Sequence, residues 1–207
     1  MPGDSGPDDA TLERSAVLSG TMVVMTDLDD LALRLSTDLD AVFPEVVHAL
    51  SPGLYSGALR MLGHRQDAED ITQDALTRAY RALGEYPAER IAALRLPGWL
   101  WTIAANLCRN RLRQRSRKAT LPLDGPDPTD TEAGPDEKAE QADLGDRLTG
   151  HLLTLSWPMR SAVVLRHVVG LTTDEISTAL DRPPATVRSD IHRGLERLRH
   201  LLDEETP

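Results

Sequence analysis

The strongest indication of the fold of this 207-residue chain is the segment Leu171–Leu202, LTTDEISTALDRPPATVRSDIHRGLERLRHLL. Thr172 and Glu175 have the spacing of a capping box, which marks the start of a helix. The short helix that follows turns three apolar residues inward: Ile176, Ala179 and Leu180. Asp181–Pro184 interrupts the chain, and Pro184 is suited to the first turn of a second helix. That second helix is predicted to bury Val187, Ile191, Leu195 and Leu198.

The exposed side of this second helix carries polar and basic residues near its start. They are Thr186, Arg188, Ser189, His192 and Arg193. A short helix, a tight turn and a second helix of this kind predict a helix-turn-helix, whose second helix enters the major groove of DNA. Arginine reads guanine there, and Ser, Thr or His contacts bases or phosphates. The alternative is a helical hairpin with a solvated basic face.

Upstream, DAEDITQDALTRAYRAL predicts a helix with one apolar and one acidic face. Ile71, Ala75, Ala79 and Leu83 recur every fourth residue. Asp67, Asp70 and Asp74 form an acidic stripe on the opposite side, flanked by Glu69 and Gln73. Such a stripe is either a solvated helix face or a docking surface for a basic partner helix, with charge steering the encounter.

The next predicted helix, opened by Pro97, contains the most basic stretch of the chain, CRNRLRQRSRK. It holds six Arg or Lys residues and no acid. Asn106, Arg109, Asn110 and Arg113 share a face, and Arg111, Arg115 and Arg117 continue the charge. Arginine supplies a fixed fork for phosphate, and asparagine supplies both a donor and an acceptor for a base edge. Trp99 is interpreted as a core residue, and Cys108 as a small core residue rather than a reactive thiol.

Composition separates the chain into two helical parts. Its formal net charge is −10, and much of the negative charge lies in residues 119–147, which hold nine acids and two bases. We expect a disordered extension over 1–27, a helical domain over 28–118, a flexible acidic linker over 119–143 and a second helical domain over 144–204. The fold class is therefore all-α, with two small domains.

Met22 and Met25 are alternatives to Met1 as the start. One cysteine, no metal-like spacing and no segment long enough to span a bilayer favour a cytoplasmic protein without a metal or other cofactor.

In this order, the three motifs resemble those of bacterial sigma factors of the extracytoplasmic-function group, over about Leu35 to Leu202. The resemblance implies a transcription initiation factor that binds core RNA polymerase and promoter DNA. It implies docking on the clamp helices of the largest subunit by Asp67, Glu69, Asp70, Gln73 and Asp74. It implies minus-ten recognition by Asn106, Arg109 and Asn110, and backbone contacts by Arg111, Arg113, Arg115 and Arg117. It implies minus-thirty-five recognition by Thr186, Arg188, Ser189, His192 and Arg193. The flap of the second-largest subunit and an anti-sigma factor are further implied partners.

Asp181, Ala185 and Asp190 depart from the family pattern, which usually has Gly, Gly and Arg at these places. Asp190 either reads a cytosine or orients Arg188 or Arg193 through a charge-assisted hydrogen bond. The spacing of three residues favours Arg193.

Two other classes of function compete with this interpretation. A helix-turn-helix repressor or activator that acts without polymerase would have no use for the acidic stripe or the Asn/Arg helix. An enzyme acting on nucleic acid would need paired carboxylates or a nucleophile with its base, and the sequence shows no such set. We therefore expect no catalytic residues. The acidic linker is either a mimic of nucleic-acid charge or a solubilising spacer.

Overall fold

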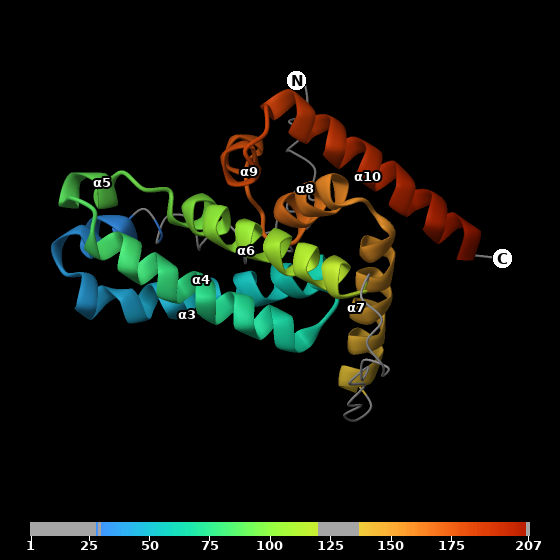
Figure 1. The fold of residues 1–207 in the computed structure, drawn as a ribbon, viewed down its shortest axis with the longest axis horizontal. Coiled ribbons are helices and arrows are strands. Elements are labelled where there is room, and N and C mark those ends of the chain that lie inside the picture. Colours follow the sequence, from blue (N-terminus) through green and yellow to red (C-terminus); the bar gives the residue numbers. More distant parts are fainter. Residues whose placement is uncertain (1–27, 29, 120–136, 206–207) are drawn as a thin grey trace, which may run out of the picture.

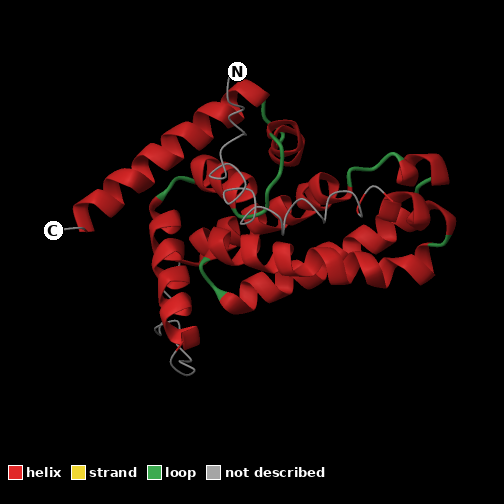
Figure 2. Cartoon of the chain, turned by 180° about the vertical axis from the view of Figure 1, so that it is seen from behind, coloured by secondary structure: helices red, strands yellow, loops and turns green. Residues whose placement is uncertain are grey.

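The computed structural model describes residue 28 and residues 30–119 and 137–205, and within these ranges every regular element is a helix (Figures 1 and 2). The predicted extension over 1–27 and most of the predicted linker lie outside the described residues. Residues 30–37 are helical, and the helices after them are α3 (Leu39–Leu62), α4 (Arg65–Gly84), α5 (Ala88–Ala92), α6 (Leu96–Ala119), α7 (Glu137–Thr154), α8 (Trp157–His167), α9 (Thr173–Leu180) and α10 (Pro184–Glu205). The all-α prediction is confirmed.

Helices α3, α4 and α6 form the amino-terminal domain. Asp38 caps α3 by accepting from the backbone N–H of Ala41 at 3.0 Å. Gly63 ends that helix at a φ of 69°, which glycine adopts without strain. Helix α3 is continuous through Pro52, although a proline removes one backbone donor from a helix interior. Pro52 is exposed, so its ring faces solvent while the buried Leu54 and Ala58 hold the following turns in the core.

The predicted apolar face of α4 is confirmed, because Ile71, Ala75, Ala79 and Leu83 are all buried. On α6, Trp101 is the buried tryptophan, whereas Trp99 is half-buried and meets Tyr86 edge-on. A separate apolar cluster extends this domain toward the amino terminus, with Leu28, Leu31 and Leu35 packed near Val46 and Leu96. The domain therefore begins at least as early as Leu28.

Helices α7 to α10 form the carboxy-terminal domain. Helix α7 begins at Glu137, earlier than the boundary predicted at residue 144, because residues 137–143 are mostly strong helix formers. The capping box is confirmed: the Thr172 N–H donates to Glu175 at 2.8 Å, and the Glu175 N–H donates to Thr172 at 3.3 Å. Asp181 adopts φ 53° and ψ 59°, the left-handed conformation that a glycine takes most easily.

The buried face of α10 differs from its prediction at one position. Val187 and Leu198 are buried and Ile191 is partly buried, but Leu195 is 38% exposed. Gly194 lies on the core side instead, where an added Cβ would come within 2.6 Å of Val163. The close approach of α8 to α10 at this glycine turns Leu195 outward.

The two domains share one hydrophobic core, which the sequence did not predict. A single buried cluster includes Met61 and Leu100 from the first domain and Leu165 and Ile176 from the second. Helix α9 contacts α6, and α7 and α8 contact α3, as Figure 1 shows. The contact is tight: an added Cβ on Gly98 would lie 2.9 Å from the Glu175 Cγ. The described parts of the chain therefore adopt a closed arrangement.

Candidate nucleic-acid and polymerase interface

Asp67 does not belong to an exposed acidic stripe, contrary to the prediction. Its side chain is 7% exposed and lies between Arg111, whose Nη1 donates to Oδ1, and Arg115, whose Nη2 is 2.7 Å from Oδ2. Both arginines come from α6, so this carboxylate ties α4 to α6 inside the domain. A buried carboxylate is tolerated because two guanidinium groups surround it.

The same contacts divide the arginines of α6 into two sets. Arg111 and Arg115 turn toward α4, and Arg111 also lies 3.4 Å from Asp70. Arg113 and Arg117 are exposed on another side of the helix. Residues four apart share a helix face, whereas residues two apart do not. Arg111 and Arg115 are thus engaged within the protein, which leaves Arg113 and Arg117 as the exposed cations of the predicted basic tract.

The rest of the acidic stripe is accessible. Glu69, Gln73 and Asp74 are exposed, and the Asp70 side chain is 45% exposed. The nearest base to Asp74 is Arg78, at 3.9 Å and equally exposed, which is a weak surface pair. These four residues form what we call the α4 acidic surface.

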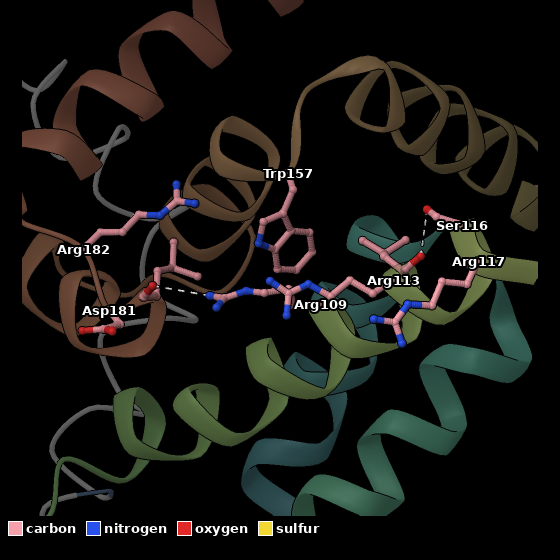
Figure 3. A pocket seen from close by; sticks show the side chains of 9 residues that line it. Arg109, Arg113, Ser116, Arg117, Trp157, Asp181 and Arg182 are labelled. Atoms are coloured by element: carbon pink, nitrogen blue, oxygen red, sulfur yellow. Dashed lines mark hydrogen bonds between the residues drawn. The ribbon is translucent and has the colours of Figure 1, made fainter. Parts of the chain in front are cut away.

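The Asn/Arg face of α6 lies beside the second domain. Asn106 and Asn110 are exposed, and the Asn106 Nδ2 donates to the Thr102 carbonyl at 2.9 Å. Arg109 is partly buried and its Nη2 donates to the Leu180 carbonyl, at the end of α9, at 3.4 Å (Figure 3). The closed arrangement therefore engages one member of this face.

The polar face of α10 is open to solvent. Thr186, Arg188, Ser189, His192 and Arg193 are all exposed. His192 Nε2 lies 3.4 Å from Glu196, one turn further along. These residues start in the first turns of α10, where a recognition helix meets base edges.

Asp190 is placed differently from the other five residues predicted on this face. It is 4% exposed and accepts from Arg193 Nη2 at 2.8 Å and from Arg182 Nη1 at 3.0 Å. The hydrogen bond to Arg193 that spacing favoured is present, and a direct contact of Asp190 with a base is not possible in this arrangement. Arg182, in the turn before α10, is a partner that the helix spacing could not reveal.

Cys108 is fully buried, as the sequence predicted for a core residue. Burial raises the pKa of its thiol to about 12, so the sulfur stays protonated and unreactive near neutral pH. Arg160 of α8 is also buried, at 8% exposure, and its Nε has no hydrogen-bond partner among the described residues. Burial lowers the pKa of this guanidinium.

In the described part of the chain, no cluster of His, Cys, Asp or Glu has the geometry to hold a metal ion. No helix among the described residues is both long and apolar enough to cross a bilayer.

Comparison with known families assigns both domains. The Sigma-70 region 2 family matches residues 46–118 and the Sigma-70 region 4 family matches residues 147–198. The chain is 34% identical over 160 residues to the ECF RNA polymerase sigma factor SigE of Mycolicibacterium smegmatis, covering 76% of this chain and 60% of that protein. It is 31% identical over 177 residues to the ECF RNA polymerase sigma factor SigW of Bacillus subtilis, covering 80% and 90%.

The fold also matches solved structures. CnrH in complex with the cytosolic domain of CnrY aligns with a TM-score of 0.63 at 21% identity, over 86% of this chain and 99% of that one. The sigma factor RpoE of Bartonella quintana, in complex with the anti-sigma factor NepR, aligns at 0.59 and 21%, over 79% and 98%. The two domains are those of a sigma-70-type factor. The chain belongs to the extracytoplasmic-function family of RNA polymerase sigma factors, alternative sigma factors for transcription initiation.

Proposed function

We propose that the chain directs core RNA polymerase to promoters through three surfaces. The α4 acidic surface docks on the clamp helices of the largest subunit. The face of α6 formed by Asn106, Arg109, Asn110 and Arg113 captures unpaired bases of the minus-ten element. The exposed face of α10 reads the minus-thirty-five element. The observation that carries this proposal is the presence of two separate exposed polar faces, on α6 and α10, in a chain of this family.

Two promoter elements demand a larger separation than the closed arrangement provides. Arg109 touches Leu180, and Thr186 is six residues further along the chain. Six residues span at most about 23 Å, since consecutive α-carbons are about 3.8 Å apart. By their names, the two elements are roughly 25 base pairs apart, or about 85 Å at about 3.4 Å per base pair. The domains therefore separate before one molecule engages both elements.

Partners follow from the family and from the solved neighbours. Core polymerase, including the flap of the second-largest subunit, binds the open form. An anti-sigma factor binds the closed form; in support, the sigma factor RpoE, whose fold matches, was solved in complex with the anti-sigma factor NepR. The place of action is the cytoplasm, where polymerase works. The activity is binding and not catalysis in its own right.

The test uses core polymerase and a matched pair of charge-reversal variants. Asp70→Arg with Asp74→Arg alters the α4 acidic surface and is expected to abolish co-purification with core polymerase. Glu85→Arg with Glu89→Arg changes the same charge at two exposed carboxylates outside that surface and is expected to bind normally. Circular dichroism confirms that both variants keep their helices.

Run-off transcription separates sigma function from its alternatives. A polymerase-independent helix-turn-helix regulator would bind duplex DNA but would not support initiation by core polymerase. Asn106→Ala with Asn110→Ala is expected to impair promoter opening, measured by permanganate footprinting, more than closed-complex binding. Normal holoenzyme assembly by the Asp70 and Asp74 variant would refute the docking role, and normal melting by the asparagine variant would refute the minus-ten role.

A further inference from the structure

The closed arrangement creates a pocket between the two domains that neither domain has alone. Its volume is about 610 Å³, within the usual range for small-molecule sites. Arg109, Leu112, Arg113, Ser116 and Arg117 line it from α6, and Trp157, Leu180, Asp181 and Arg182 line it from the second domain. Figure 3 shows Trp157 above the arginines of α6, with Arg182 across from them.

The pocket carries an excess of positive charge. Four guanidinium groups and one carboxylate line it, so its lining residues carry a net charge of +3. Arg182 already pairs with Asp190, and Arg109 with a backbone carbonyl. Arg113 and Arg117 have no partner among the described residues. Arg109, Arg113 and Arg117 follow one another at intervals of four, a row of about 12 Å along one helix face. Such a row fits several linked phosphates better than a single one.

Trp157 gives the pocket an apolar wall beside the arginines. Its Nε1–H is buried and has no acceptor among the described residues. Because solvent does not reach this nitrogen, the carbon atoms of the indole ring are the part of Trp157 that faces the pocket. The indole ring, Leu112 and Leu180 add an apolar surface beside the arginines. Phosphates on the arginine row would leave an attached planar base next to this surface.

We propose that this interdomain pocket binds a nucleoside polyphosphate. Phosphates contact Arg113, Arg117 and Arg182, and the base packs on the indole ring of Trp157. Because the arginine row and Trp157 belong to different domains, the bound ligand holds the closed arrangement together. If the chain reads promoters as proposed, the ligand competes with DNA for Arg109 and Arg113.

Titration calorimetry on the full chain tests the site, without polymerase or DNA. ATP is expected to bind saturably, tripolyphosphate about tenfold more weakly, and adenosine not measurably. Trp157→Phe replaces the indole by a smaller ring, which reduces the surface for the base, and is expected to weaken ATP binding about fivefold. Arg117→Gln is expected to weaken the binding of ATP and the binding of tripolyphosphate by the same factor, about tenfold. Arg199→Gln removes an exposed arginine of α10 outside the pocket and serves as the control.

A variant that separates the domains tests whether both are required. Val169 and Leu153 lie in the interdomain contact, near Gly57 and Gly63. Val169→Asp with Leu153→Asp is expected to increase the radius of gyration in X-ray scattering and to abolish ATP binding. Unchanged ATP affinity in this opened variant would overturn the proposal. The proposal would also be overturned if ATP showed no saturable binding, or if Arg117→Gln and Arg199→Gln changed ATP affinity equally. It would be overturned too if a short single-stranded oligonucleotide bound more tightly than ATP and Trp157→Phe left that binding unchanged. None of these outcomes bears on polymerase binding, which is measured separately.

Discussion

Replacing Asp190 by alanine tests whether the recognition helix depends on a buried ionic cluster. The Asp190 side chain is 5% exposed and receives one guanidinium from the preceding turn and one from its own helix, Arg182 at 3.0 Å and Arg193 at 2.8 Å. The substitution removes both acceptors and leaves two cations. Loss of the contact with Arg182 is expected to cost more stability, because the Arg182 side chain is 24% exposed whereas that of Arg193 is 54% exposed.

The magnitude follows from how much water can reach the two arginines. A hydrogen bond to a charged group contributes roughly 1.5–3 kcal/mol, and breaking a fully buried ion pair costs about 3–5 kcal/mol. Arg193 is half exposed and regains hydration, so its contact contributes little to the loss. Arg182 regains part of its hydration. We therefore expect Asp190→Ala to lower the free energy of unfolding by about 1–2 kcal/mol, which is about a five- to thirty-fold change in the folding equilibrium.

Urea denaturation of the full chain measures this loss as a shift in midpoint at constant slope. Glu196→Ala is the control, because it removes an exposed carboxylate of the same helix and is expected to change the stability by less than about 0.5 kcal/mol. Binding-site selection with holoenzyme should show weaker preference at one minus-thirty-five position, since Arg193 loses its orienting partner. An Asp190→Ala effect no larger than that of Glu196→Ala would refute the cluster.

Three further predictions concern the closed arrangement and the turn. Arg160→Met is expected to stabilise the chain by roughly 1–2 kcal/mol in thermal or urea denaturation, because it removes a buried cation that has no carboxylate partner among the described residues; a loss of stability would reveal a compensating anion. Cys108, with its pKa raised to about 12, is expected to react with a thiol reagent at pH 8 far more slowly in the native chain than in urea; equal rates would contradict its burial. Asp181→Gly is expected to raise the free energy of unfolding by about 0.5–1 kcal/mol, because φ 53° strains a residue with a Cβ; a neutral or destabilising result would show that the Asp181 side chain contributes contacts of its own.

Local patterns were sufficient for the helices and for much of the site. The capping box at Thr172 and Glu175 and the four-residue periodicity of α4 are short-range features, and both are found as predicted. The exposed face of α10 follows equally from helix geometry, since residues on one side of a helix share their environment. The Asp190–Arg193 contact was predictable for the same reason: its partners are three residues apart on one helix.

Long-range pairing decided what the sequence could not. Periodicity shows which side of α4 is polar, but only the position of α6 shows that Asp67 is enclosed by Arg111 and Arg115. The sequence likewise gives no measure of how closely α8 approaches α10, and that distance at Gly194 turns Leu195 outward.

By itself, the sequence determined the helical class, the motif order and the family resemblance, because each depends on residues close together in the chain or on their order. The tertiary structure alone decided that the two domains share a core and that Arg109 reaches Leu180. It also formed the arginine-lined pocket beside Trp157. These features depend on contacts between residues far apart in the chain, such as Arg109 and Leu180, which are 71 positions apart. The pattern of a hydrophobic face does not specify which other face will cover it.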